Sequence, residues 1–540
     1  MLGRREFLLT LPLPLFAARE LRCDVAVIGG GVGGCAAALG ALRNGRSVVM
    51  SEETDWIGGQ LTSQAVPPDE HPWIEQFGAT ELYRTYRRKV RDYYRQHYPL
   101  TAEARARVHL NPGDGLVSRL THEPKASLAV LEQLLAPYLT GGQLTLLLNY
   151  RPVSASTAGD SVRAVTLRHR DGRELTAQAL YFVDATEQGD LLPLTKTEFV
   201  TGFESRRQTG EAHAPLEAQP NNIQAFTVCF AVDYLPGQDH TIEKPQDYDF
   251  WRDYVPRMTP PWPGKLLSWS MSNPITLAER KVMFDPTGRT DSDGALNLFL
   301  YRRIVNRGNF ANRTVQSDVS LVNWPQNDYW LGNLHGVTEA EAARHLERGR
   351  QLSLSLLYWM QTDGGWKGLR LRPDVTGTAD GLAKSPYIRE SRRIQAEFTV
   401  LEQHVGTEAR KPATDAAQFT DSVGIGSYRI DLHPSSGGDN YVDISSLPFQ
   451  IPLGALIPKR VENLIAGAKN LGVTHITNGC YRLHPVEWNI GESAGALAAH
   501  AIESKNPPRR IRNDAKLLAA FQASLISQGV EIAWPKLLPR

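Results

Sequence analysis

Apolar and polar positions near the N-terminus predict a strand, a helix and a second strand. Residues 22–28 become continuously apolar from Val25 onward, as expected of a parallel strand buried on both faces. Small residues from Cys35 onward predict a helix, and residues 47–51 predict a second strand that ends at Glu52. These segments together predict one βαβ unit.

Further along the chain, two segments with a regular pattern of apolar and polar positions flank a long segment without one. Residues 128–139 predict an amphipathic helix and residues 144–148 a strand, while Asp171-Gly172 between two alternating segments predicts a hairpin. Residues 83–97, rich in Tyr and Arg, predict a solvated helical face. Tryptophans, prolines and polar loops dominate residues 204–441, apart from one long helix predicted at 339–360. A strand at 463–467 and a helix from Gly491 to Glu503 follow.

This order predicts an α/β protein with a discontinuous domain. We expect a Rossmann-like doubly wound domain in residues 21–203 and 442–505. An α+β substrate domain would be inserted at 204–441, and residues 506–540 would form a C-terminal tail. Residues 1–20 would be a leader.

Composition narrows the class of protein further. The chain has 540 residues, is 41% hydrophobic and carries a formal net charge of +1, which gives no electrostatic reason to expect a nucleic-acid partner. No apolar run reaches the ~20 residues that cross a bilayer.

Arg4-Arg5 before a short apolar run and Ala17-Ala18 resemble a twin-arginine signal, which predicts export to the periplasm. The alternative is an uncleaved leader on a cytoplasmic protein. The four cysteines show no paired spacing, and no metal-binding spacing stands out.

A glycine-rich loop between the first strand and the first helix predicts a dinucleotide site. A helix start offers unpaired N–H groups to a diphosphate, provided that side chains do not block the approach. We expect Gly29 to permit the tight turn, Gly31 to touch the diphosphate and Gly34 to let the helix pack on the sheet. Glu52 would accept both ribose hydroxyls and repel a 2′-phosphate. The predicted binding residues here are Gly29, Gly30, Gly31, Gly33, Gly34 and Glu52.

Three C-terminal stretches carry a family resemblance. Residues 451–458, 461–467 and 482–495, with a further motif at 388–394, resemble the FAD-dependent oxidoreductase family of the glutathione-reductase-like FAD superfamily, which is related to fumarate reductase and succinate dehydrogenase flavoproteins. The resemblance implies FAD as cofactor and a helix start near Gly491 that faces the flavin. It adds to the implied cofactor-binding residues Gly59, Asp184, Gly467, Arg482, Gly491 and Glu492. The chain departs from the family at Gly467-Ala468-Lys469, where members have Gly-Arg, and at His484, where members have Met.

Candidate catalytic residues follow from these motifs. His484 could accept the substrate proton, or could simply pack against the flavin. His475 is a second candidate, or a polar loop residue. Arg392, with Arg389 and Arg393, could bind an anionic group or form a salt-bridge network.

Two further segments have open interpretations. Arg482 could hold a flavin phosphate or an anionic substrate, or pair with Glu487 or Glu492. Residues 323–329 could line a substrate pocket or cover a core.

The predicted activity is FAD-dependent dehydrogenation of a small polar molecule, with hydride passed to flavin N5. Only one dinucleotide fingerprint is present, since Gly424-Ile425-Gly426 does not open a helix, so electrons would leave to oxygen, a quinone or a carrier. One alternative is a reductase of an unsaturated acceptor, with Arg392 or Arg393 as proton donor. Another is a flavin-binding subunit without turnover of its own.

Overall fold

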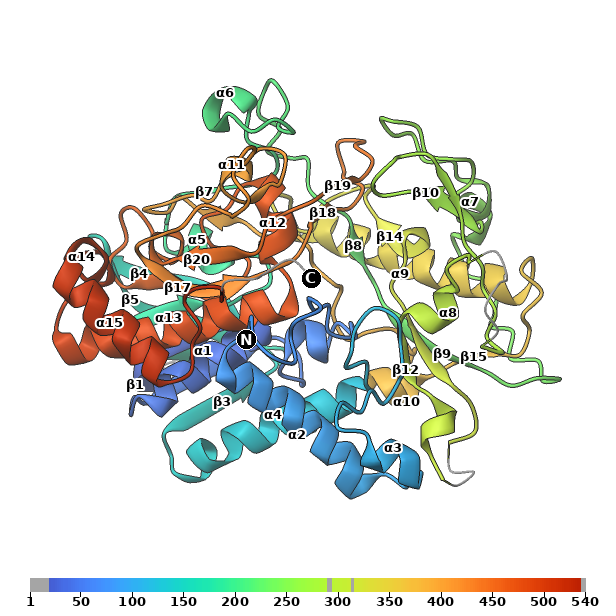
Figure 1. Cartoon of the computed structure of the whole chain (residues 1–540), viewed down its shortest axis with the longest axis horizontal. Coiled ribbons are helices and arrows are strands. Elements are labelled where there is room, and N and C mark those ends of the chain that lie inside the picture. The colour runs from blue at the N-terminus through green and yellow to red at the C-terminus, as the bar shows by residue number, and fades with distance from the viewer. Residues whose placement is uncertain (1–18, 289–293, 312–314, 536–540) are drawn as a thin grey trace, which may run out of the picture.

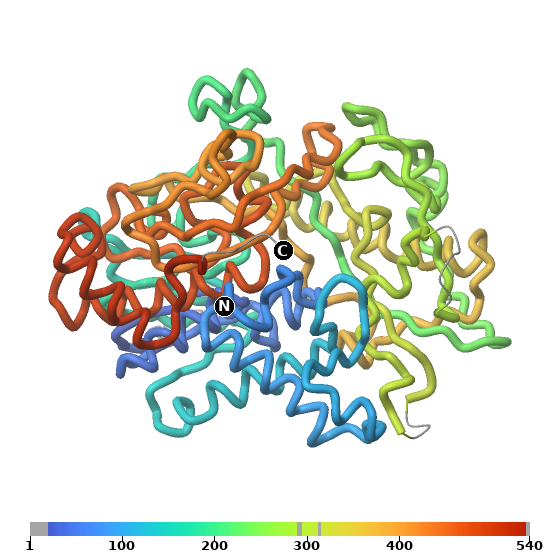
Figure 2. The backbone as a smooth tube through the Cα atoms, in the orientation of Figure 1, coloured from blue at the N-terminus to red at the C-terminus, as the bar shows by residue number. Residues whose placement is uncertain are grey.

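The computed structural model describes residues 19–288, 294–311 and 315–535, so most of the predicted leader lies outside the described residues. The two ends of the chain, blue and red in Figure 1, lie together in one lobe, and the yellow-green middle of the chain forms the other. Figure 2 shows the backbone passing from the first lobe to the second and back. Segments far apart in sequence therefore build one structural unit.

The first lobe is built on a seven-stranded sheet in the order β3-β2-β1-β6-β5-β4, with β21 also pairing with β6. Its strands are β1 (Arg19–Ile28), β2 (Val48–Glu52), β3 (Leu144–Leu148), β4 (Tyr150–Ala158), β5 (Ser161–His169), β6 (Glu174–Asp184) and β21 (Leu464–Ala466). Strands β3, β2, β1, β6 and β21 run parallel, while the β4–β5 and β5–β6 pairs are antiparallel. This confirms the α/β, Rossmann-like class and the hairpin at Asp171-Gly172.

Strand β6 is shared between two neighbours on one side. Its first residues pair with β5, from Glu174 opposite Arg168, and its last residues pair with β21, where Phe182 lies opposite Leu464. A strand from the C-terminal part of the chain thereby pairs with the end of β6 that β5 leaves free. Strand β1 begins at Arg19, earlier than the predicted residue 22.

Helix α13 (His484–Ser504) packs along α1 (Val32–Arg43) at backbone distance. A Cβ placed on Gly491 would lie 2.0 Å from the carbonyl oxygen of Gly33. The predicted helix start near Gly491 is therefore wrong, because Gly491 is inside the helix. The helix begins at His484 with Pro485 in its first turn, where a proline is tolerated because the first N–H groups have no partner.

Helix α2 (Glu81–His97) corrects a second prediction. It is not a solvated face, because Tyr83, Tyr86 and Arg87 are buried, and it packs against α4 (Pro124–Thr140). Arg87 is 2% exposed and donates to Glu70 at 2.8 Å and to Glu75 at 2.7 Å. These carboxylates allow a charged side chain to lie inside the protein.

A four-stranded antiparallel sheet separates two apolar cores, in the order β12 (Arg303–Val305), β13 (Val319–Val322), β9 (Phe230–Tyr234) and β15 (Leu369–Leu371). On β9, Ala231 joins the core of the first lobe while Phe230 and Val232 join the core of the second, as expected of alternating side chains. Helix α9 (Glu339–Gln361) lies in the second lobe and confirms the predicted long helix. Side chains from Ile394 to Leu432 also join the first core, so the domain boundaries at 204 and 441 stay predictions.

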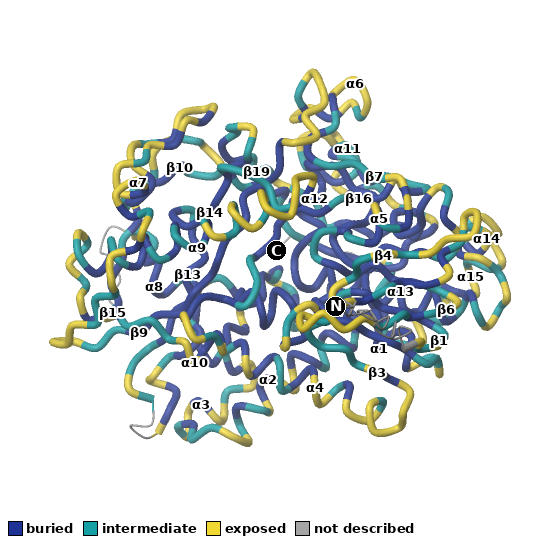
Figure 3. The backbone as a smooth tube through the Cα atoms, turned by 180° about the vertical axis from the view of Figure 1, so that it is seen from behind, coloured by how far each residue is buried: buried dark blue, intermediate teal, exposed yellow. Residues whose placement is uncertain are grey.

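Shorter elements complete the two lobes. The helices are α3 (Ala102–Ala106), α5 (Leu191–Leu194), α6 (Arg206–Thr209), α7 (Tyr248–Asp253), α8 (Leu298–Tyr301), α10 (Pro373–Thr376), α11 (Glu402–Val405), α12 (His475–Tyr481), α14 (Pro508–Asn513) and α15 (Ala515–Ser527). The strands are β7 (Phe199–Val200), β8 (Phe226–Thr227), β10 (Ser270–Ser272), β11 (Glu279–Lys281), β14 (Asp328–Tyr329), β16 (Arg393–Ile394), β17 (Ser422–Gly426), β18 (Ile430–Leu432), β19 (Val442–Ile444) and β20 (Phe449–Pro452). Figure 3 shows exposed backbone mainly at the rim, in loops such as the one around α6. Among the described residues, no helix combines the length and apolar character that a membrane span requires.

Candidate functional site

The turn from β1 into α1 leaves a helix start free of side chains. Gly29 has a φ of +100°, and a Cβ there would lie 2.2 Å from the carbonyl oxygen of Ala185, so the turn requires glycine. Gly31 is the N-cap of α1 and has no side chain to cap the helix, while the Gly33 N–H in the first turn donates to Glu487. The start of α1 can therefore receive an anion through its backbone N–H groups.

Glu52 ends β2 directly beside this loop. One carboxylate oxygen accepts a hydrogen bond from the Gly30 N–H at 3.1 Å, and the other accepts from the Thr54 N–H at 2.9 Å and hydroxyl at 2.8 Å. Burial raises the pKa of Glu52 to about 8. A carboxylate offers about four acceptor positions, so Glu52 retains capacity for sugar hydroxyls.

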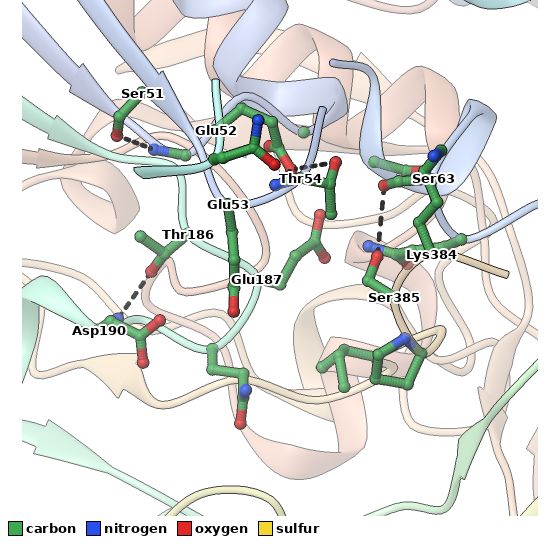
Figure 4. A pocket seen from close by; sticks show the side chains of 18 of the residues that line it. Ser51, Glu52, Glu53, Thr54, Ser63, Thr186, Glu187, Asp190, Lys384 and Ser385 are labelled. Atoms are coloured by element: carbon green, nitrogen blue, oxygen red, sulfur yellow. Dashed lines mark hydrogen bonds between the residues drawn. The ribbon is translucent and has the colours of Figure 1, made fainter. Parts of the chain in front are cut away.

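A cavity of about 660 Å³ opens in front of the loop and Glu52. Of the predicted cofactor-binding residues, Gly29, Gly31, Glu52 and Gly59 line it. In Figure 4, Ser63 and Ser385 face one another on one side of the cavity, and Thr186 and Asp190 lie on the other. The volume is within the usual ~300–1,000 Å³ of small-molecule and cofactor pockets.

Asp184, Gly33, Gly34 and Gly467 shape the loop from behind and do not line the cavity. Asp184 accepts hydrogen bonds from the Thr186 N–H at 3.1 Å and hydroxyl at 2.7 Å, and burial raises its pKa to about 7. Gly467 donates its N–H to the Asp184 carbonyl at 2.9 Å, and a Cβ on Gly33 would lie 2.0 Å from the Gly467 oxygen. These residues fix the distance between α1 and the sheet.

A buried lysine neutralises two carboxylates at the same loop, a role that the sequence analysis missed. Lys469 contacts Glu187 and lies 3.5 Å from Glu487, and its own side chain is fully buried. Glu487 accepts from the Gly33 N–H at 3.4 Å and from the Gln60 amide at 2.6 Å. Burial raises the pKa of Glu487 to about 7, against the opposing effect of Lys469. The sequence signal for this role was Gly467-Ala468-Lys469, where members of the family have Gly-Arg.

His484, the first candidate for proton transfer, does not line the cavity. It is fully buried in the first turn of α13, and its Nδ1 accepts a hydrogen bond from the Asp69 N–H at 3.1 Å. Burial and, to a lesser degree, Arg302 lower the pKa of His484 to about 3. Since a general base works best with a pKa near the working pH, this environment favours a neutral, packed imidazole.

The other two catalytic candidates belong to hydrogen-bonded networks behind the cavity. His475 contacts Glu390 at 2.9 Å and stacks on Phe203. Burial opposes ionisation of Glu390, but His475 and the contacting Arg393 outweigh it and lower the pKa of that carboxyl to about 2. Arg392 donates to the Gln188 carbonyl at 2.8 Å and to Asp190 at 3.0 Å, which supports the cavity wall from outside.

Arg482, Gly491 and Glu492 also lie away from the cavity lining. Arg482 pairs with Asp431 at 3.1 Å, and not with Glu487 or Glu492 as one of the sequence interpretations held. Glu492 pairs with Arg43 at 3.3 Å and accepts from the Trp488 indole at 3.1 Å. Gly491 has no side chain and thereby lets α13 pack directly against the backbone of α1. The cofactor roles of all three stay predictions.

His433, which the sequence analysis did not single out, lies between two carboxylates. Its Nδ1 lies 2.6 Å from Asp328, and its Nε2 lies 3.6 Å from Asp431. The Asp328 contact orients the ring with Nδ1–H as donor, which leaves Nε2 as the basic nitrogen. The pattern Asp431-Leu432-His433 in an irregular segment gave little signal, because Asp328 is remote in sequence.

The parallel sheet, the uncapped start of α1, Glu52 and the adjoining cavity define a dinucleotide-binding α/β protein. The sequence profile of the family described as "FAD dependent oxidoreductase" matches residues 24–525. The chain belongs to this family, and its cofactor is FAD, which the uncapped helix start and Glu52 fit.

Comparison with solved structures finds matches of low sequence identity. E. coli quinol fumarate reductase FrdA is 12% identical, with 94% of this chain and 74% of that chain covered and a TM-score of 0.32. OxyS anhydrotetracycline hydroxylase from Streptomyces rimosus is 11% identical, with 94% and 66% covered and a TM-score of 0.33. L-proline dehydrogenase from P. horikoshii is 18% identical over 35% of this chain, with a TM-score of 0.18, and the match spans only 26% of that chain. No curated protein matches the sequence.

Proposed function

We propose that the protein is an enzyme that oxidises a small polar substrate with FAD as the oxidant. The observation that carries this proposal is the cavity of about 660 Å³, which joins the start of α1 and Glu52 to a second wall. That wall consists of Gly59, Ser63, Gln64, Lys384, Ser385, Pro386 and Ile388. When bound, FAD supplies a two-electron acceptor for hydride. An external acceptor such as oxygen, a quinone or a carrier would complete the cycle.

The residues of the chain have separate tasks in binding FAD. The first N–H groups of α1 bind the diphosphate, and Glu52 accepts hydrogen bonds from the ribose hydroxyls. Glu187 lies against the same loop, since a Cβ on Gly31 would lie 2.6 Å from its carboxylate. Lys469 offsets the charge of Glu187 and Glu487, which would otherwise repel a diphosphate.

His433 is the proton acceptor that we propose in place of His484, although both side chains lie outside the cavity lining. Its Nδ1 contacts Asp328 and its Nε2 lies 3.6 Å from Asp431, so the ring is held between two carboxylates. His484 has no such partner and is held neutral by burial. Arg392 and Arg393 are both engaged with carboxylates, which argues against either of them as the proton donor of the reductase alternative.

Flavin reduction tests this function directly. The purified protein should carry FAD, and its visible flavin band should bleach under anaerobic conditions with at least one member of a panel of small hydroxy and amino compounds. His433→Asn should slow that bleaching by on the order of 100-fold or more, as expected for loss of a general base. His484→Asn is the matched control and should retain most of the rate. Flavin that is reduced by dithionite but by no compound of the panel would refute the dehydrogenase proposal.

The paired arginines Arg4 and Arg5 support export by the twin-arginine route as part of the same proposal. Replacement of both with lysine should shift the full-length protein from the periplasmic to the cytoplasmic fraction of a bacterial host. An unchanged distribution would argue for the cytoplasmic alternative.

A further inference from the structure

A group of charged side chains lies where the two lobes meet, outside the cavity lining. We call it the interlobe cluster, and its members are Asp69, Arg302, Asn323, Asp328, Tyr387, Arg389, Asp431, His433 and Arg482. All are buried except His433 and Asp431, whose side chains are 17% and 18% exposed. They come from both lobes.

Contacts connect the cluster from one arginine to the next. Arg389 lies 3.0 Å from Asp328, which in turn contacts His433 at 2.6 Å. Arg482 lies 3.1 Å from Asp431 and donates to the Tyr387 hydroxyl at 2.8 Å. Arg389 also lies over the ring of Tyr387, at 4.9 Å from its centroid, which closes the circuit.

Arg302 joins the circuit through Asn323. Its Nε donates to the Asn323 carbonyl at 3.2 Å, while the Asn323 side-chain oxygen accepts from Arg389 at 3.2 Å. Arg302 also lies 3.8 Å from Asp69. Hydrogen bonds, ion pairs and one ring contact thereby connect the three guanidinium groups.

Several donors in this cluster lack acceptors. Nη1 of Arg302, Nε of Arg389, Nε of Arg482 and Nδ2 of Asn323 are buried without a hydrogen-bond partner. Buried donors in folded proteins are nearly always paired, because an unpaired one is destabilising. Because all four are donors, the group that satisfies them must be rich in acceptors, as a carboxylate is.

The charge of the cluster agrees with this requirement. Burial opposes ionisation of Asp328, but Arg389 and His433 outweigh it and lower the pKa of that carboxyl. At Asp69, burial prevails over Arg302 and raises the pKa. Three guanidinium groups therefore face three carboxyls, and Asp69, the partner of Arg302, is the one whose pKa burial raises.

The interlobe cluster adjoins the flavin cavity through two chain segments. Ser63 and Gln64 line the cavity, and Asp69 follows them in the same segment. Ile388 lines the cavity, while its neighbours Tyr387 and Arg389 belong to the cluster. A small molecule bound at the cluster would therefore lie next to the cavity wall.

We propose that the interlobe cluster binds the carboxylate of the substrate, so that the substrate is a small carboxylic acid. This inference rests on the proposed function and names the class of its substrate. Arg302, Arg389 and Arg482 hold the carboxylate, and His433 stands beside the carbon chain that it carries.

Malonate tests the site without knowledge of the true substrate. Titration of the FAD-containing wild-type protein with malonate should give a saturable shift in the flavin absorbance band and a rise in melting temperature. Malonamide has the same shape without the charge and should produce neither effect at the same concentrations. Equal effects of both compounds, or no effect of malonate, would overturn the proposal.

Two arginine variants locate the binding. Arg302→Gln or Arg389→Gln should weaken malonate affinity on the order of 10- to 100-fold, as expected for loss of one charged hydrogen bond. Arg393→Gln is the matched control, since Arg393 is equally buried but pairs with Glu390 and Glu204 outside the cluster. It should bind malonate as the wild type does. Wild-type affinity in both cluster variants would overturn the proposal. If the variants do not fold, the wild-type contrast between malonate and malonamide still decides.

The melting-temperature readout separates this inference from the proposed function. A colourless protein that malonate stabilises would refute the flavoenzyme proposal and retain the anion site. A yellow protein that a non-acidic substrate reduces, and that malonate does not affect, would refute only the anion site.

Discussion

Alanine at Gly31 and at Gly33 should give opposite results, although the two glycines are two positions apart in one loop. A Cβ on Gly31 would meet only the end of the Glu187 side chain at 2.6 Å, which can move away. A Cβ on Gly33 would lie 2.0 Å from the Gly467 carbonyl oxygen, which belongs to fixed backbone. The first change affects the space for the cofactor, and the second affects the contact that fixes α1 against the sheet.

The magnitudes follow from these contacts. Forced repacking at Gly33 costs about 1–3 kcal/mol, offset by up to ~1 kcal/mol from the better helix propensity of alanine. From the middle of the first range, about 2 kcal/mol less the offset, we expect Gly33→Ala to lower the apparent free energy of unfolding by about 1–2 kcal/mol. Gly31→Ala should leave the stability of the flavin-free protein within about 0.5 kcal/mol and weaken FAD binding at least 10-fold, or ~1.4 kcal/mol.

Urea unfolding of the flavin-free proteins and FAD titration by flavin fluorescence would measure the two effects separately. Gly31→Ala protein that binds FAD with wild-type affinity would refute the assignment of this loop to the diphosphate. A Gly33→Ala protein as stable as the wild type would refute the argument that α1 has no room to move.

Three further outcomes follow from buried charges. Burial raises the pKa of Glu52 from 4.5 to about 8, so the stabilising contribution of this carboxyl is full below about pH 4.5 and is lost as pH rises through 8. The free energy of unfolding of the flavin-free protein should therefore fall by up to a few kcal/mol from about pH 5 to 8, and it should fall less in Glu52→Gln. Identical pH profiles of the two proteins would contradict this. Lys469→Gln leaves the buried Glu487 and the partly exposed Glu187 uncompensated and should cost about 3–5 kcal/mol in urea unfolding. Lys384→Gln, at a pair with the half-exposed Asp55, should cost under about 1 kcal/mol. Arg87→Gln should lower the free energy of unfolding by a similar amount, about 3–5 kcal/mol, whereas Arg88→Gln, at the exposed neighbouring position, should change the melting temperature little. Equal melting temperatures of the two variants would restore the prediction of a solvated helix.

Local patterns predicted the dinucleotide-binding half of the fold well. The strand before Gly29, the helix after it and the hairpin at Asp171-Gly172 are each encoded by adjacent residues, and the structure contains all three. The start of α13 was misread because Pro485 resembles a loop signal, although proline is also common in a first helical turn. Neighbouring residues could not distinguish the two possibilities.

Charged groups that pair across long sequence separations were the main omissions. Arg87 was assigned to solvent because its partners Glu70 and Glu75 precede the helix in a segment without periodic pattern. His433 was passed over because Asp328 is brought to it only by the folded second lobe. Side-chain chemistry at such sites depends on tertiary pairing, to which sequence periodicity is blind.

The shared strand β6 has a consequence for how this protein is made. Its first half finds β5 through a short hairpin, but the end of the strand stays an open edge until β21, far down the chain, has been synthesised. An unpaired edge in a partly made sheet invites wrong pairing, so a nascent chain stalled before Leu464 should depend on chaperones. Any fragment that ends in the second lobe would lack this strand and should aggregate instead of forming a smaller, working nucleotide-binding protein.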